Sequence, residues 1–221
     1  MRTATSIMVQ LGKRTVPCQF WTGQRLQSSS SLPMALDVET ALIEDERRMP
    51  CLALAVASDG RTHVAIHPSR LAAFLEQHRE AHFVGHNVQF DFWVIDEHLK
   101  HHGDPAARRV LWDACHSGRL RDTMILDMLV QLATGNYRRA GRSPGGEEET
   151  AKVYPGNLAQ VVADYTTVQV CKEDPYRTRF GELVGLAEEA WPGVDPGFFR
   201  YAVLDAAATH RLYPALAEVA Y

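Results

Sequence analysis

The feature that most constrains the fold is a pair of carboxylates inside an apolar run. Asp37 and Glu39 lie two residues apart within residues 34–43. Because side chains alternate between the two faces of a strand, both acids should point one way while Leu36 and Val38 point the other. Neighbouring carboxylates are costly to bury unless a positive charge lies between them. The doublet therefore indicates either a site for a hard divalent cation or a half-exposed edge strand with solvated acids.

Composition favours one globular domain. The chain has 221 residues, of which 46% are hydrophobic and 23% are charged, and its net charge is −4. Its apolar runs, such as residues 51–57, are far shorter than the roughly 20 residues that a membrane span needs, so no membrane association is expected. The negative charge gives no general attraction to nucleic acid, but a carboxylate site filled with metal would reverse its local sign. The four cysteines show no C-x-x-C spacing, which is typical of a reducing compartment such as the cytoplasm.

The N-terminal segment allows two interpretations. Residues 1–36 contain no Asp or Glu but carry arginines and serines, which is typical of an organellar transit segment. Residues 7–11 and 16–21 instead have the composition of short strands around a Gly-Lys-Arg turn. The second interpretation is favoured, with residues 1–33 forming an N-terminal extension that includes possible short strands.

The remaining pattern predicts a mixed α/β domain over residues 34–221. Residues 52–57 and 62–66 flank a Ser-Asp-Gly-Arg turn, so three strands should form an antiparallel meander. Alternating helices and two further strands should complete a central sheet flanked by helices. The expected helices cover residues 68–77, 88–99, 124–132, 156–165, 180–190 and 197–213, the further strands cover 81–85 and 120–122, and a polar loop covers 136–150.

Two other motifs contain acids at defined positions. Asp91 follows a strand ending near Gly85, and Asn87 is placed to cap the helix whose first turn includes Asp91. Asp195 and Pro196 form a helix start, so Tyr201 and Asp205 share one helix face at positions i and i+4. Each motif alone is common in helices that have no catalytic role.

Together the three motifs resemble the DEDD superfamily of 3′–5′ exonucleases in its tyrosine subclass, above all the proofreading domain of family A DNA polymerases. The matching segments are Asp37-Val-Glu39, Asn87-Val-Gln-Phe-Asp91 and Tyr201-Ala-Val-Leu-Asp205, in the family's order. Thr40 and the phrase Asp122-Thr-Met-Ile-Leu also match. The histidine subclass places a His five residues before the last Asp, where this chain has Arg200.

The resemblance implies a ribonuclease H-like fold and two divalent cations, Mg²⁺ or Mn²⁺, about 3.5–4 Å apart. Asp37 would bridge the cations, Glu39 and Asp205 would complete the one on the nucleophile side, and Asp91 would support the other. Tyr201 would orient the attacking water. Residues lining the path of a single-stranded or frayed DNA 3′ end would be Thr40, Leu42, Ile43, Asn87 and Phe90.

Several alternatives stay open at this point. Leu42 and Ile43 could simply pack in the core. Basic residues at 138, 139, 142, 172, 177 and 179 could bind backbone phosphate or be solvated. The polymer could be RNA trimmed by an enzyme of the ribonuclease D kind, or the domain could bind nucleic acid without cleaving it. If the enzyme is a proofreading nuclease, its DNA polymerase partner would be a separate chain.

Overall fold

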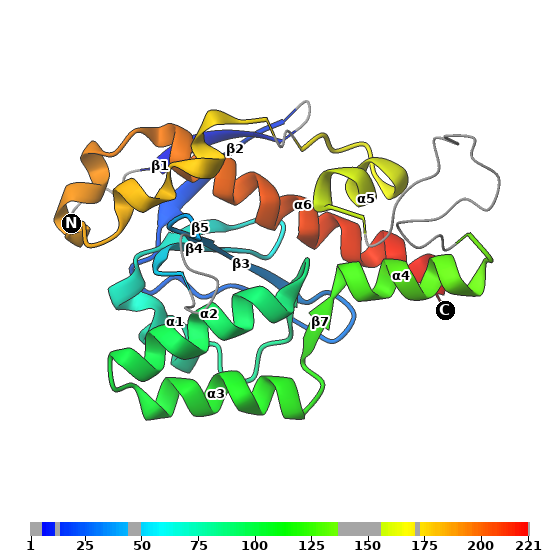
Figure 1. The fold of residues 1–221 in the computed structure, drawn as a ribbon, viewed down its shortest axis with the longest axis horizontal. Helices are drawn as coiled ribbons and strands as arrows, with labels where there is room; N and C mark the ends of the chain where they lie inside the picture. The colour runs from blue at the N-terminus through cyan, green and yellow to red at the C-terminus, as the bar shows by residue number, and fades with distance from the viewer. Residues whose placement is uncertain (1–5, 12–13, 44–49, 137–155, 171–172, 221) are drawn as a thin grey trace.

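The protein is built around a seven-stranded mixed sheet with the strand order β1-β2-β5-β4-β3-β6-β7 (Figure 1). This computed structural model describes residues 6–11, 14–43, 50–136, 156–170 and 173–220. The strands are β1 (Ser6–Leu11), β2 (Arg14–Phe20), β3 (Met34–Thr40), β4 (Leu52–Ser58), β5 (His63–Ile66), β6 (Phe83–Gly85) and β7 (Leu120–Asp122). The expected mixed α/β class is confirmed.

The predicted meander forms the middle of the sheet. Strands β3, β4 and β5 pair antiparallel in succession, and β4 is buried along its whole length. The turn from β4 to β5 closes on Asp59, whose Oδ1 accepts the N–H groups of Arg61 at 2.9 Å and Thr62 at 2.7 Å. The two further strands follow on the other side, where β6 runs parallel to β3 and β7 parallel to β6.

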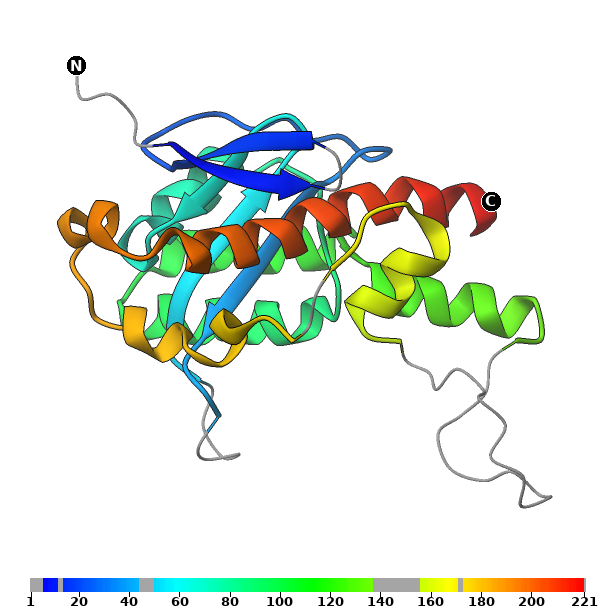
Figure 2. The ribbon, with the colours of Figure 1, turned by 90° about the horizontal axis from the view of Figure 1, so that it is seen from above.

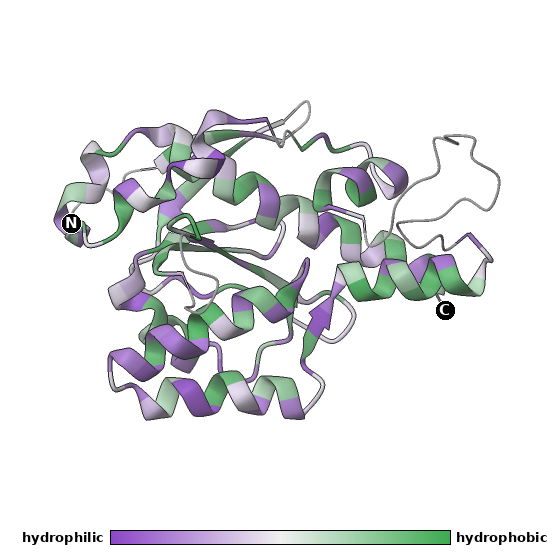
Figure 3. Cartoon of the chain, in the orientation of Figure 1, coloured by the Kyte–Doolittle hydropathy of each residue, from purple (hydrophilic) through white to green (hydrophobic). Residues whose placement is uncertain are grey.

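Helices cover both faces of the sheet. On one face α1, α2 and α3 pack on a core that includes Leu36, Val38 and Phe74, and on the other α6 packs on a core that includes Val56 and Phe199 (Figure 1). Figure 3 shows these helices banded with hydrophobic and hydrophilic residues, as expected of helices that bury one side. The helices are α1 (Leu71–Gln77), α2 (Val88–His101), α3 (Pro105–His116), α4 (Thr123–Ala133), α5 (Leu158–Tyr165) and α6 (Pro196–Ala220). No described helix is long and apolar enough to span a membrane.

The structure differs from the sequence-based expectation in two helical regions. Helix α3 was not predicted, although Pro105 starts it at a position that favours proline. The helix predicted over residues 180–190 is wrong, because this region forms two short 3₁₀ turns, η3 (Phe180–Leu183) and η4 (Glu188–Gly193). Between them Val184 is extended and Gly185 has φ +77°, a left-handed conformation that ends a helix. The predicted polar loop lies outside the described residues from residue 137 onward.

The N-terminal segment contributes two strands to the same sheet. β1 and β2 form an antiparallel hairpin, and β2 pairs in parallel with β5 through Cys18, Gln19 and Phe20. Figure 2 shows this hairpin lying along α6. The short strands expected at 7–11 and 16–21 are thus present, and they extend the central sheet instead of forming a separate unit.

Candidate functional site

The acidic doublet lies on the face of the sheet that α6 covers. Leu36 and Val38 are buried in the core beneath α1, α2 and α3, whereas Asp37 and Glu39 are half-buried and alternate with them. The pairing of β3 with β4 becomes irregular between Glu39 and Thr40, where the sheet ends. The strand therefore presents both carboxylates near its carboxyl end, as the alternation of side chains predicted.

Asp91 is brought to the doublet by a bond to the backbone of β3. Strand β6 pairs with β3 only at Met34 and Ala35, so it does not occupy the amide of Val38. Asp91 Oδ1 accepts that N–H at 3.0 Å. Since Val38 lies between Asp37 and Glu39 in the chain, the bond holds the Asp91 carboxylate beside the doublet.

The predicted capping role of Asn87 is wrong. Asn87 precedes α2 in the left-handed conformation, with φ 64° and ψ 46°, and its side chain makes no capping hydrogen bond. The carboxylate of Asp122 serves instead, because Oδ1 accepts the N–H of Asn87 at 3.1 Å and Oδ2 accepts that of Val88 at 2.9 Å. Asp122 Oδ1 also accepts the N–H groups of Met124 at 2.8 Å and Ile125 at 3.3 Å. One carboxylate thus caps both α2 and α4.

Tyr201 and Asp205 reach the same region from α6. Asp195 Oδ1 accepts the N–H of Gly197 at 2.8 Å, so the helix starts where the sequence predicted. Both side chains are buried on one face of the helix. Burial raises the pKa of Tyr201, and the carboxylates of Asp205, Glu39 and Asp37 raise it further. These electrostatic neighbours show that the tyrosine lies among acids from two separate elements.

The carboxylates also act on one another. Burial raises the pKa of Asp91 well above its usual range, and the neighbouring Asp37 raises it further, while the Val38 N–H opposes the shift. Two acids that disfavour each other's charge are typical of sites that bind cations. The fold has therefore assembled an acidic cluster from residues 37, 39, 91 and 205.

The donor chemistry of this cluster suits a hard divalent cation. All four side chains offer carboxylate oxygens, the ligands that Mg²⁺ and Mn²⁺ prefer, and the raised pKa of Asp91 marks crowding that a cation would relieve. As the described side chains lie, however, no three His, Cys, Asp or Glu residues are close enough to hold a metal ion together. Binding a cation would therefore require the carboxylates to turn toward one another.

Two of the predicted substrate-binding residues are exposed. Leu42 and Ile43 follow β3 with 60% and 57% of their surface accessible, so the alternative of core packing is wrong for both. Asn87 is exposed, while Thr40 and Phe90 are half-buried. In the sequence these positions lie within four residues of Glu39 or Asp91. Their roles toward a substrate stay predictions.

Two candidate phosphate-binding residues, Arg177 and Arg179, differ in the side chains that they contact. Arg179 forms a bidentate pair with Glu182 through contacts of 2.7 and 3.0 Å, which occupies its guanidinium. Arg177 is exposed on the 3₁₀ turn η2 (Pro175–Thr178) and lies close enough to Tyr201 to lower its pKa. Positions 138, 139, 142 and 172 lie outside the described residues.

The role of Asp122 is not evident from the family motifs, in which it is only part of a matching phrase. An Asp directly before an apolar helix is nevertheless a capping signal. That signal indicated the cap of α4. The bonds to Asn87 and Val88 join segments more than thirty residues apart and have no local signal.

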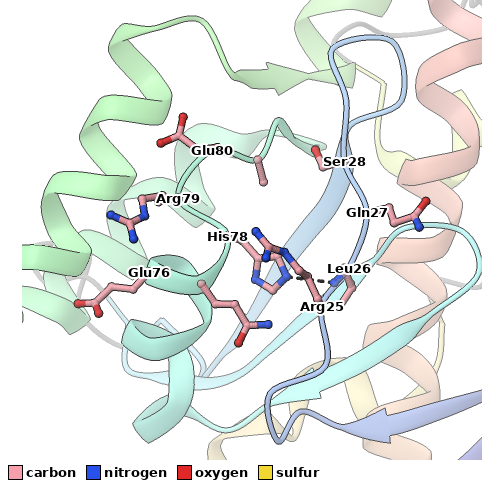
Figure 4. A pocket seen from close by; sticks show the side chains of 10 residues that line it. Arg25, Leu26, Gln27, Ser28, Glu76, His78, Arg79 and Glu80 are labelled. Atoms are coloured by element: carbon pink, nitrogen blue, oxygen red, sulfur yellow. Dashed lines mark hydrogen bonds between the residues drawn. The ribbon is translucent and has the colours of Figure 1, made fainter.

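One pocket lies away from these acids. A groove of about 790 Å³ separates residues 25–28 from the end of α1 (Figure 4). His78 in its wall accepts the N–H of Leu26 through Nε2 at 3.1 Å and donates through Nδ1 to Phe74 O at 2.9 Å. Both ring nitrogens are thus hydrogen-bonded, one to the N-terminal segment and one within α1, which gives this groove a structural explanation.

Comparisons with known proteins bear on the fold. No protein-family model matches the sequence, and no curated protein does so either. Among solved structures, the chain is similar to the crystal structure of the Aedes aegypti Nibbler EXO domain, with a TM-score of 0.54 and 16% sequence identity over 84% of this chain and 78% of that one. The shared architecture confirms the ribonuclease H-like fold, and this protein has the fold of an EXO domain.

Proposed function

We propose that this protein is a metal-dependent 3′–5′ exonuclease that hydrolyses phosphodiester bonds at single-stranded or frayed DNA 3′ ends. The observation that carries the proposal is the convergence of five side chains from three distant segments: Asp37, Glu39, Asp91, Tyr201 and Asp205. The likeness to an EXO domain supports the same activity class. The Tyr-x-x-x-Asp motif favours the tyrosine subclass, and the Asn-x-x-Phe-Asp motif together with Thr40 favours its polymerase-like branch.

The residues have separate roles in this mechanism. The four carboxylates would hold two Mg²⁺ or Mn²⁺ ions, which supply a nucleophilic water and neutralise charge on the phosphate and the leaving oxygen. Tyr201, which keeps its proton because its pKa is raised, donates a hydrogen bond that orients the attacking water. Arg177 is exposed and lies close enough to Tyr201 to lower its pKa, so it can attract the phosphate backbone toward the acids.

The exposed residues after β3 fit the requirement for a free terminus. Leu42 and Ile43 place two apolar side chains in solvent next to the acidic cluster. Such side chains can stack or wedge against unpaired bases, which would separate the last nucleotides from a complementary strand.

The test uses 5′-labelled single-stranded DNA and RNA of the same sequence, incubated with Mn²⁺, Mg²⁺ or EDTA. A ladder that shortens from the 3′ end with either cation, stronger for DNA and absent in EDTA, is the expected result. The matched variants are Asp37→Asn and Asp113→Asn, the second of which alters an exposed acid on α3. Preference for RNA would move the enzyme to the ribonuclease D kind. Inactivity on both polymers with both cations would leave a domain that only binds nucleic acid.

A further inference from the structure

A second polar site lies on the opposite side of α6 from the acidic cluster. His210 follows Asp205 by five residues, which rotates it by about 140° around the helix axis. There a cavity of about 270 Å³ lies between β2, the turn from β4 to β5 and the second half of α6. Its apolar walls come from Val16, Val168, Ala207, Ala208 and Pro214, and its polar groups from His63, His210 and Arg211.

Two buried histidines in this cavity each have a ring nitrogen without a hydrogen-bond partner. His63 is 2% exposed and His210 is 9% exposed, and the Nε2 atoms of both lack a partner among the described residues. Gly60 brings the backbone directly against the His210 ring, because a Cβ at position 60 would lie 2.5 Å from Cε1. Buried polar nitrogens without partners are rare in folded proteins and call for an explanation such as a ligand.

The hydrogen bonds of Ser58 determine what His63 offers. Ser58 is fully buried, and its Oγ accepts the N–H of Gly60 at 3.1 Å while lying 2.9 Å from His63 Nδ1. The hydroxyl hydrogen is satisfied when it is donated to Nδ1, which places the ring hydrogen of neutral His63 on Nε2. His63 therefore presents an N–H donor on the side of the ring that faces away from Ser58.

The polar groups that line the cavity favour an anion over a metal ion. Arg211 lines the cavity and is exposed. The negative charge of Asp59 acts on both histidines, but its carboxylate is held in the turn by N–H groups of Gln27, Arg61 and Thr62 and does not line the cavity. No third His, Cys, Asp or Glu among the described residues completes a metal site with the two imidazoles. An N–H donor and a guanidinium above apolar walls complement an oxyanion on an apolar body.

We propose that this cavity binds a small organic anion, a carboxylate or phosphate monoester, whose oxygens accept hydrogen bonds from His63 and Arg211 and whose apolar part contacts the Val, Ala and Pro walls. The site is separate from the acidic cluster, so it stands whether or not the protein is a nuclease.

The test is a titration of the full chain with hexanoate, thymidine 5′-monophosphate, inorganic phosphate and hexan-1-ol, up to about 10 mM, a range suited to the millimolar affinity of a small ligand. The readout is the set of histidine side-chain nitrogen resonances in NMR. We expect hexanoate or the nucleotide to shift the Nε2 resonances of His63 and His210 and leave the other eight histidines unchanged. Hexan-1-ol, which has a similar body without the charge, should shift neither.

The variant Arg211→Gln should weaken binding by about three- to tenfold. The matched control is Arg200→Gln, which removes another exposed arginine of the same helix outside this cavity and should leave binding unchanged. Two results would overturn the proposal: no shift of either histidine with any anion, or equal weakening by both arginine variants. A response of the two histidines to Ni²⁺ but to no anion would also overturn it, in favour of a metal site.

Discussion

At the scale of single residues, the acidic cluster places like charges close together, which lowers the stability of the fold. Asp91 is buried beside Asp37, and both the burial and the neighbouring charge disfavour its ionised form. Perturbed pKa values of this kind cluster at functional sites, and the function we propose for this one is to hold cations. The carboxylates could be located from the sequence because each occupies a fixed position within one element. Their mutual contacts could not, because they depend on the pairing of distant segments.

Asp37→Asn should separate activity from stability. The substitution removes a carboxylate charge that raises the pKa of Asp91 and is one of the proposed metal ligands. We expect nuclease activity to fall on the order of 10²–10⁴-fold, since a metal contact contributes several kcal/mol of charge stabilisation. The melting temperature should stay the same or rise, because one source of repulsion is gone. The measurement compares turnover and thermal unfolding between the wild type and the variant. A variant that keeps wild-type turnover would exclude Asp37 from the reaction.

Tyr201→Phe should reduce turnover by about 10–10³-fold without abolishing it, because the tyrosine orients water while the cations activate it. Burial and three carboxylates raise the pKa of Tyr201, so its hydroxyl should keep its proton throughout the neutral range. The pH–rate profile of the wild type should therefore show no alkaline decline caused by this group below about pH 10. A decline near pH 8 that disappears in the Phe variant would show that the tyrosine acts as a base.

At the scale of elements, Asp122 joins the starts of two helices, one of which carries Asp91. Its carboxylate accepts four backbone N–H groups, two at the start of α2 and two at the start of α4. Helix α2 carries Asp91, so this junction fixes where Asp91 meets β3. The sequence predicted both helices correctly but assigned the cap of α2 to Asn87. Asn87 has the left-handed backbone conformation and makes no side-chain capping bond, and a distant acid caps the helix instead.

Asp122→Ala should destabilise the fold by about 1–3 kcal/mol, since two helix caps are lost at once. Turnover should fall as well, because α2 would no longer hold Asp91 against Val38. Asp122→Asn keeps one oxygen that can accept but replaces the other with a donor, so it should lose about half of this stability. Urea unfolding of the wild type and the two variants measures the order of their stabilities. Equal stability of all three would show that water replaces the carboxylate at both caps.

At the scale of the whole molecule, the order of the middle strands can be predicted from local sequence patterns, whereas the pairing of the N-terminal edge strands cannot. The meander of β3, β4 and β5 is joined by short connections, so its order is evident from the sequence. The hairpin β1–β2 joins the sheet beside β5 through pairs such as Cys18 with His63, a contact between positions 45 residues apart that no local pattern announces. The same hairpin forms one wall of the His63–His210 cavity, so that site too could be found only in the folded chain.

Several histidines have a lowered pKa in the folded state, so each of them should destabilise the protein as the pH falls. Burial lowers the pKa of His63, His78, His98 and His210 in the folded state. In the unfolded chain their pKa is about 6.5, so the unfolded state takes up protons first as the pH falls. Their contribution to stability is therefore complete above that pH and is lost as the pH falls through it.

Asp91 has the opposite effect on the pH dependence of stability. Its raised pKa means that the folded state holds this proton more tightly, so its contribution to stability is present at low pH and is lost as the pH rises. The variant Asp91→Asn removes that contribution and leaves the histidines. We expect urea midpoints of this variant to fall steadily from about pH 7.5 to about pH 5.5, more steeply than those of the wild type, because the opposing acid is absent. Parallel slopes in the two proteins would mean that Asp91 ionises normally and that the acids of the cluster do not crowd one another.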